Sequence, residues 1–294
     1  VSVYPHNYMD LLIFYIYFSP YFIYSLLIEV KMKNTIANRC KQYERSSDQV
    51  LTPYMPIILR LDGNSFSKMT KKMEFEKPFD EEFRKGMEEA MKALMEYLGA
   101  SFAYSQSDEI SILLFNRDKP GKLGDRVSKL CSLTASIASN GFNKYFLDTR
   151  NEFLSVNFDC RAFNVPERDV NNIFLWRQRD AYKNAVYSYA YYQLQKELGM
   201  SKKEVFNLLM KKNVQEKNEI IYQKLGFNFN DLDTKFKRGF SLIRKDVEVS
   251  VKELPLESQR FLEGKDFITR RKLVFDYEIP LFDKDTSYIE NFLK

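Results

Sequence analysis

Histidine is almost absent from this sequence, and cysteine is scarce. The single histidine, His6, lies near the N-terminus, outside the part that is typical of a folded domain. This excludes Ser-His-Asp triads, Cys-His pairs and histidine-ligated zinc from the main domain. The three cysteines, Cys40, Cys131 and Cys160, form no CxxC pair. They therefore indicate neither a zinc site nor a disulfide framework, and they favour a reducing, cytoplasmic setting. Any chemistry must come from carboxylates, hydroxyls, lysine, arginine or oxygen-bound metals.

A strong charge of one sign is also missing. The chain has 45 basic and 40 acidic residues, for a net charge of +5. This mild excess is compatible with a polyanionic partner without requiring one. No Walker A sequence and no GxGxxG occurs, which excludes a P-loop or Rossmann phosphate cradle. The length of 294 residues and the 45% hydrophobic content are those of a globular chain with a substantial core.

The first 31 residues form a hydrophobic N-terminal segment that differs from the rest. Residues 11–28 are almost wholly apolar and approach the length of a membrane span. Pro20 and crowded aromatic residues weaken an anchor, and the basic region and cleavage site of a signal peptide are missing. Because the composition changes abruptly at Met32, we favour a translation start there. A membrane anchor is the second interpretation, and membrane contact is expected only in that case.

The order of elements along the chain predicts an α+β fold. Asp62-Gly63 is a turn signal that should end the first strand, and Lys77-Pro78 should open the first long helix, which Gly99 caps. The expected elements are helix 33–46, strand 55–61, helix 77–98, strands 101–106 and 110–115, helix 125–146, strand 155–163 and helix 169–198. The central β-α-β-β-α-β order is that of a ferredoxin-like, split βαβ domain. We expect a catalytic domain over 32–165 and a helical and mixed C-terminal extension over 166–294.

Two carboxylate positions stand out in this predicted fold. Asp62 ends the first strand, and Asp108 and Glu109 occupy the tip of the predicted hairpin. The first strand and the hairpin share a sheet in a split βαβ fold, so these side chains can meet at one edge. An oxygen-only site of this kind selects Mg²⁺ or Mn²⁺, and two such ions would serve phosphoryl transfer. The alternative is that Asp62-Gly63 and Ser107-Asp108 simply form turns.

Three cations lie near these turns in the sequence or in the expected sheet. Arg60, Lys77 and Arg161 would suit a triphosphate, which needs cations as well as metal. For each cation taken singly, a surface or salt-bridge role is the competing interpretation.

Six segments of the chain, in order over about residues 33–245, resemble the tRNA(His) guanylyltransferase family. They are RLDGNSFSKMTKKMEFEKPFD at 60–80, YSQSDEISILL at 104–114, FDCR at 158–161, WRQRD at 176–180, KNEIIY at 217–222 and KRGFSLI at 237–243. The resemblance implies a polymerase palm domain that works in the 3′-to-5′ direction. It also implies that an RNA 5′ end is activated by ATP, or carries a triphosphate, before the 3′-hydroxyl of an incoming nucleotide attacks it. The expected assembly is a homotetramer that binds tRNA.

The resemblance also implies a role for individual residues. Asp62 and Asp108 would bind two Mg²⁺ ions, with the carbonyl of Gly63 assisting, and Glu109 would support them as a third catalytic carboxylate. The implied nucleotide contacts, with ATP and GTP as substrates, are Arg60, Gly63, Asn64, Lys77, Ser107 and Arg161. The implied RNA contacts are Trp176, Arg177, Asn184 and Lys217.

One departure from the family pattern affects the predicted reaction. Eukaryotic guanylyltransferases follow WRQxD with a His-Ile-Asn-Asn-Leu-Tyr-Asn-like run, whereas this chain has Tyr182 at the histidine position and keeps only Asn184 and Tyr187. We therefore predict template-dependent addition of nucleotides to tRNA 5′ ends, as in the guanylyltransferase-like repair branch. The alternatives are strict tRNA(His) guanylylation, a palm-type nucleotide cyclase and a non-catalytic RNA-binding module. Gln106-Ser107 stands where diguanylate cyclases carry two glycines, which argues against the cyclase.

Overall fold

The computed structural model describes residues 35–115, 121–255 and 266–293, together with residues 257, 259, 261, 262 and 264. The hydrophobic segment 1–31 lies outside the described residues. Among the residues that are described, no helix has the length and apolar character needed to cross a membrane. The contacts divide the chain into two units between Gln49 and Val50, and each unit is described by itself.

The described part of the first unit contains one helix, α2 (Ile36–Arg45), where a helix over 33–46 was predicted. The Oγ1 of Thr35 accepts the N–H of Asn38 at 3.2 Å and caps its first turn. No residue of α2 is buried.

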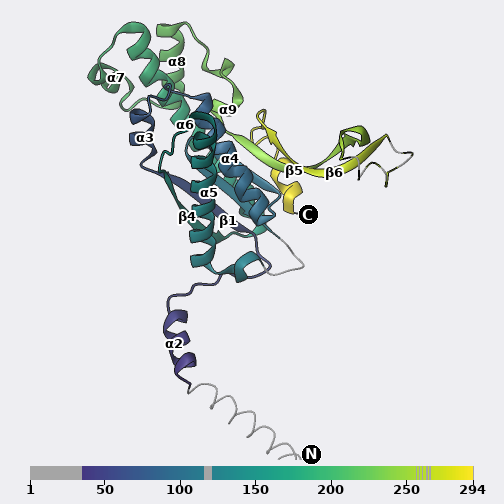
Figure 1. The fold of residues 1–294 in the computed structure, drawn as a ribbon. Helices are drawn as coiled ribbons and strands as arrows, with labels where there is room; N and C mark the ends of the chain where they lie inside the picture. The colour runs from purple at the N-terminus through teal and green to yellow at the C-terminus, as the bar shows by residue number, and fades with distance from the viewer. Residues whose placement is uncertain are drawn as a thin grey trace, which may run out of the picture. The chain divides into compact units, whose positions relative to one another are not determined.

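The second unit is built on one antiparallel sheet of six strands in the order β4-β1-β3-β2-β5-β6 (Figure 1). The strands are β1 (Ile57–Asn64), β2 (Phe102–Gln106), β3 (Glu109–Leu114), β4 (Asn157–Asn164), β5 (Phe240–Ser250) and β6 (Phe267–Asp276). The prediction of a mixed helix-and-strand fold is confirmed.

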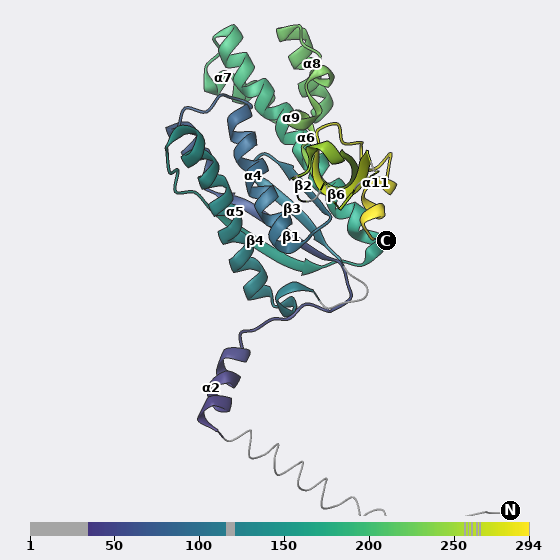
Figure 2. The same ribbon diagram turned by 45° about the vertical axis from the view of Figure 1, so that its right-hand side comes forward.

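Helices cover both faces of this sheet (Figure 2). The longer ones are α3 (Phe66–Lys72), α4 (Glu81–Leu98), α5 (Val127–Arg150), α6 (Glu167–Leu198), α7 (Lys202–Leu209) and α8 (Val214–Leu225). The short ones are η1 (Lys122–Asp125), η2 (Phe229–Asp231), α9 (Thr234–Lys237), η3 (Val251–Glu253), α11 (Ser287–Glu290) and η4 (Asn291–Leu293).

Successive side chains of β1 point to opposite faces of the sheet and pack into two different hydrophobic cores. Leu59 and Leu61 are fully buried with residues of α4 and α5, such as Met91 and Phe142. Ile58 lies on the other face and packs with Phe174 of α6. Because successive side chains of a strand point to opposite faces, Arg60 and Asp62 lie on the α6 face with Ile58. A third core joins the C-terminal half of α6 to α7 and α8.

Several predicted boundaries are shifted, and the helix predicted over 125–146 is α5, which continues to Arg150. Two boundaries that rested on a local turn or helix-start signal are wrong. The first strand does not end at Asp62-Gly63 but continues to Asn64, because β4 pairs with β1 as far as Asn64 and Asn157. The long helix does not open at Lys77-Pro78 but begins at Glu81. The carboxylate of Asp80 caps it by accepting the N–H of Phe83 at 2.8 Å. Gly99 ends this helix in the left-handed region at φ +66°, as predicted.

Candidate active site

Asp62 and Asp108 come together because the hairpin tip is fixed to β1. In the antiparallel register, Asp62 lies opposite Glu109 of β3, which places the two-residue turn Ser107-Asp108 beside it. The N–H of Gly63 donates to the carbonyl of Asp108 at 3.0 Å and holds this turn in place. Ser107 has a positive φ of 49°, a backbone conformation that is uncommon for serine and frequent at functional sites.

Burial and neighbouring carboxylates raise the pKa of both aspartates. Burial raises the pKa of Asp108, and the charges of Asp62 and Glu109 raise it further. The pKa of Asp62 is also raised, first by partial burial and then by Asp159, its partner on β4. Three arginines oppose the shift at Asp62, namely Arg60, Arg161 and Arg177. A bound cation would relieve this repulsion, since a nearby positive charge favours ionised carboxylates.

Glu109 differs from the two aspartates because both of its oxygens have a protein partner. Arg177 of α6 donates to Oε1 and Oε2 at 2.7 Å each, and it also donates to Asp180 at 3.1 Å. Glu109 and Arg177 are 7% and 8% exposed. Arg177 was expected at RNA, but the structure places its guanidinium against these two carboxylates.

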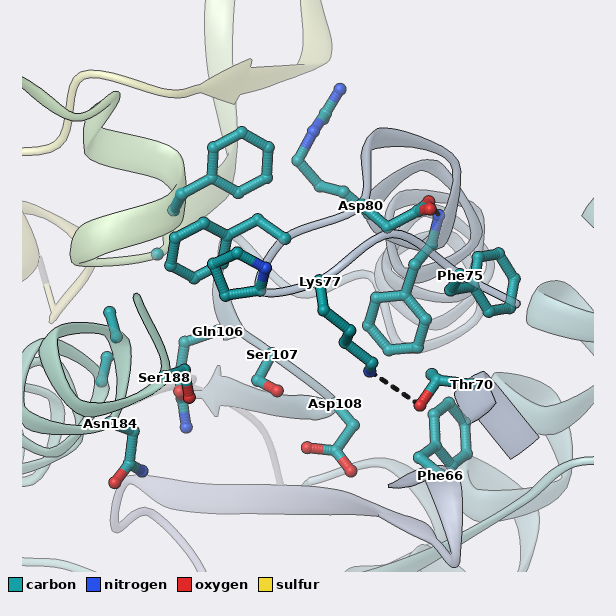
Figure 3. Close-up of a pocket in the computed structure, with 18 of the residues that line it drawn as sticks. Phe66, Thr70, Phe75, Lys77, Asp80, Gln106, Ser107, Asp108, Asn184 and Ser188 are labelled. Carbon is teal, nitrogen blue, oxygen red and sulfur yellow. Dashed lines mark hydrogen bonds between the residues drawn. The ribbon is translucent and has the colours of Figure 1, made fainter. Parts of the chain in front are cut away.

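A pocket of about 290 Å³ opens beside Asp108 (Figure 3). Lys77, in the loop before α4, donates from Nζ to Oγ1 of Thr70 at 2.9 Å. Burial lowers the pKa of Lys77, while the charges of Asp80 and Asp108 act in the opposite direction. The ammonium group, the hydroxyl of Ser107 and the carboxylate of Asp108 thus line one pocket.

The opposite wall of the pocket is aromatic and polar. Phe79 and Phe236 stack with ring centroids 5.1 Å apart and planes at 16°. Asn184 and Ser188 contribute polar side chains from α6, as Figure 3 shows. Gly239 also lines the pocket, at φ +84°, where an added Cβ would lie 2.4 Å from the carbonyl oxygen of Ser105. Apolar rings beside a few polar and cationic groups suit a ligand with a flat ring and an anionic end.

A second group of predicted residues lies on the α6 face of the sheet. Arg60 and Arg161 are direct cross-strand partners on β1 and β4. The guanidinium carbon of Arg60 lies 5.4 Å from the ring centre of Trp176, which is 51% exposed. This face therefore presents two cations and an aromatic ring next to Asp62.

Two other predicted residues, Asn64 and Lys217, do not line the pocket. Asn64 is exposed at the end of β1 and accepts a hydrogen bond from its neighbour Ser65 at 3.0 Å. Lys217 lies on α8, with Nζ 5.5 Å from the ring centre of Tyr187, and does not line the described pocket.

Sequence reasoning missed Asp159 and Thr70. Asp159 lies in the FDCR segment, two residues before Arg161 and on the same face of β4. The alternation of strand side chains could have indicated it once β4 was paired with β1. No local sequence signal indicates that Thr70 meets Lys77.

Comparison with known proteins agrees with the fold. Residues 37–166 match the family model described as tRNAHis guanylyltransferase, and residues 168–279 match the Thg1 C-terminal domain. A tRNA(His) guanylyltransferase from Schizosaccharomyces pombe is 35% identical over 216 residues, which cover 71% of this chain and 80% of the relative.

Two solved structures are similar over nearly their whole length. Both are described as a bacterial tRNA(His) guanylyltransferase (Thg1)-like protein. The ATP complex is 30% identical in sequence and has a TM-score of 0.71. The match covers 88% of this chain and 99% of the solved chain. The GTP complex is 29% identical in sequence and has a TM-score of 0.64. The match covers 88% of this chain and 98% of the solved chain. With the two family models and the yeast relative, these matches show that the chain belongs to the tRNA(His) guanylyltransferase family of nucleotidyltransferases.

Proposed function

We propose that this chain adds a guanylyl nucleotide to the 5′ end of tRNA(His) by metal-assisted phosphoryl transfer. The observation that carries the proposal is the meeting of Asp62 and Asp108 beside a pocket that also holds Lys77 and Ser107. The name of the yeast relative supports this reaction better than the templated repair predicted from the sequence.

The catalytic unit that we propose is a ferredoxin-like polymerase palm. Its support is the connectivity β1-α4-β2-β3-α5-β4 with the strand order β4-β1-β3-β2. That order and the all-antiparallel pairing are those of a split βαβ domain. In such a domain, the end of β1 and the β2–β3 turn lie at the same edge of the sheet, where Asp62 and Asp108 are.

We propose Mg²⁺ as the metal, held by the carboxylates of Asp62 and Asp108 and the carbonyl of Gly63. No group of three or more His, Cys, Asp and Glu side chains suited to a metal occurs among the residues that the structure describes. Two carboxylates nevertheless fit Mg²⁺, which binds through one or two of them and takes substrate phosphates and water as its other ligands. The pKa of both aspartates is raised, first by burial and then by a neighbouring carboxylate, and a bound cation would counter both effects. When bound, two such ions would stabilise the attacking and leaving oxygens of the transfer.

Other residues of the chain would bind the nucleotide and the RNA. Lys77 and Ser107 would bind the triphosphate of ATP or GTP in the pocket, with the base toward Phe79 and Phe236. The solved relatives that bind ATP and GTP support these two nucleotides. Arg60 and Arg161 would neutralise phosphate on the α6 face, where Trp176 offers a ring to stack on RNA. Glu109, held by Arg177, would fix the position of the strand that follows the Asp108 turn.

Templated addition to 5′-truncated tRNAs is the second candidate, and Tyr182 favours it. Tyr182 takes the place of the histidine that the family pattern has in strict guanylyltransferases. Its hydroxyl donates to Oδ1 of Asn230 at 3.4 Å and accepts from Nδ2 of Asn218 at 3.1 Å. The side chain therefore contacts α8 and η2, and it does not line the described pocket.

One assay tests the proposal and separates the two candidates. The full chain is incubated with Mg²⁺, ATP, labelled nucleotides and tRNAs that lack their first 5′ nucleotide, with the opposing acceptor base varied. Guanosine added to tRNA(His) whatever the opposing base supports the proposal. Addition that follows Watson–Crick pairing on many tRNAs supports the second candidate. No incorporation under any of these conditions would reject both. Size-exclusion chromatography with light scattering would show whether the active form is the predicted homotetramer.

A further inference from the structure

Lys77 reaches the pocket from the loop 73–80, which joins α3 to α4. Its ammonium group donates to the hydroxyl of Thr70 at 2.9 Å, beside Ser107 and Asp108 (Figure 3). A lysine side chain is a flexible four-carbon stem, so the position of its charge also depends on how its backbone is held. The contacts of the residues that follow Lys77 therefore bear on how it meets a phosphate.

Two residues shortly after Lys77 contact α9, which comes from the C-terminal part of the chain. The ring of Phe79 stacks on the ring of Phe236, with centroids 5.1 Å apart and planes at 16°. The ammonium group of Lys235 lies 2.6 Å from Oε1 of Glu81, the first residue of α4. Phe79 and Glu81 are two and four residues beyond Lys77. α9 therefore holds the loop at the point where it enters α4.

The C-terminal end of α9 is fixed to β2, the strand that leads to the turn at Asp108. The hydroxyl of Tyr104 on β2 donates to the carbonyl of Arg238 at 2.6 Å. Gly239 lies so close to β2 that an added Cβ would be 2.4 Å from the carbonyl oxygen of Ser105. α9 therefore connects the loop that carries Lys77 to the strand that carries the Asp108 turn.

The ring stack is the stronger of the two contacts between α9 and the loop. An ion pair that water can reach contributes little, and the side chain of Glu81 is 51% exposed. A stacked aromatic pair is stabilised by its ring geometry as well as by the area that it buries, and both rings are half-buried. Phe236 is therefore the residue of α9 whose loss should affect the loop most.

We propose that Phe236 is a positioning residue that holds Lys77 at the triphosphate of the bound nucleotide, through its stack on Phe79. This inference rests on the proposed function, which places a triphosphate at Lys77. Lys77 belongs to the region 37–166, whereas Phe236 belongs to the C-terminal match at 168–279. The C-terminal part of the chain would thus complete the nucleotide pocket before any RNA binds.

Inorganic tripolyphosphate separates an effect on Lys77 from a direct contact with the base, because it has phosphates and no base. Isothermal titration in the presence of Mg²⁺ measures its binding and that of ATP to the full chain. We expect Phe236→Ala to bind both about fivefold more weakly, which corresponds to the loss of one aromatic pair. Phe236→Tyr keeps the ring and should bind both within about twofold of the wild type.

Phe227→Ala is the matched control. It removes another half-buried ring, which stacks on Tyr189 with centroids 5.0 Å apart and does not line the described pocket. Its affinity for tripolyphosphate should equal that of the wild type. The melting temperature of Phe236→Ala should fall no further than that of Phe227→Ala.

A double variant shows whether Phe236 acts through Lys77. Because Lys77→Met already lacks the ammonium group, the addition of Phe236→Ala should not weaken tripolyphosphate binding further. A merely structural role of Phe236 would add its own loss to that of Lys77→Met.

The outcomes separate this inference from the proposed function. Wild-type affinity for tripolyphosphate in Phe236→Ala overturns the inference, as does an additive loss in the double variant. A loss confined to ATP, or a wild type that binds ATP but not tripolyphosphate, also overturns it and leaves Phe236 as a base contact only. If the wild type transfers no nucleotide to tRNA but Phe236→Ala weakens tripolyphosphate binding only when Lys77 is present, the proposed function fails and the positioning role stands.

Discussion

Arg177 and Glu109 form a two-point ion pair under the candidate site, with Nε to Oε1 and Nη2 to Oε2 both at 2.7 Å. The pair joins α6 to the start of β3 across 68 residues of sequence. It fixes the strand that follows the Asp108 turn against the helix that carries Trp176. Both the stability of the fold and the geometry of the site should therefore depend on it.

Arg177→Met is expected to destabilise the protein by about 3 kcal/mol, because it leaves the buried charge of Glu109 without its partner. Arg179→Met is the matched control on the same helix. Arg179 bonds Asp283 at 3.2 Å and is 62% exposed, so its loss should cost under about 1 kcal/mol. Urea unfolding of both variants measures the difference, and equal losses would contradict the assignment.

Divalent metal should stabilise the wild type through Asp62 and Asp108. At 100 times its dissociation constant, Mg²⁺ would add about 2.7 kcal/mol to the free energy of unfolding. A melting curve recorded with Mg²⁺ and again after EDTA measures the gain. Asp62→Asn and Asp108→Asn should fold and lose both this gain and nucleotide transfer. Asp148→Asn, which changes an exposed carboxylate of α5, should keep both. If Asp108→Asn were still stabilised by Mg²⁺, the assignment of Asp108 as a metal ligand would be wrong.

Thr70 should help to hold Lys77 at the triphosphate. Thr70→Val removes one hydrogen bond to Nζ and should weaken ATP binding about fivefold, or about 1 kcal/mol. Lys77→Met removes the charge itself and should weaken binding roughly 10- to 100-fold, as expected for a charged hydrogen bond. Isothermal titration with ATP gives both constants. Thr149→Val, whose hydroxyl bonds a carbonyl within α5, serves as the control. A normal affinity in Lys77→Met would place the triphosphate elsewhere.

Gly239 is required at the start of β5 for two reasons, its positive φ and its close approach to Ser105. Gly239→Ala should cost about 1–2 kcal/mol for the backbone conformation and about 1–3 kcal/mol more for the overlap. Gly226 has a φ of +64° with open space around it, so Gly226→Ala should lose only the first part. Chemical denaturation compares the two, and a similar loss in both would show that the neighbouring strand moves aside.

The sequence predicted most elements as far as residue 198, and three residues that it singled out, Lys77, Ser107 and Asp108, line the pocket. It was a poor guide to the partners of individual residues. The cap at Gly99 follows from side chains within a few residues and is found where expected. The predicted hairpin tip included Glu109, but the turn is Ser107-Asp108 alone, because Glu109 pairs with Gln106 as the first residue of β3. The strand end at Asp62-Gly63 was wrong because pairing with β4 overrides a local turn preference. Local sequence signals cannot predict pairing with a strand that lies almost a hundred residues further along the chain.

The kind of chemistry available to this protein follows from the amino-acid sequence alone. The lack of histidine in the main domain and of glycine-rich phosphate loops leaves carboxylates, hydroxyls and cations, and the ordered segments identify the family. The folded chain was needed to show that Arg177 holds Glu109 and that Asp159 lies opposite Asp62. This division reflects the range of the interactions. Propensity and periodicity act between neighbours along the chain, whereas strand register and buried ion pairs depend on which distant segments pack together.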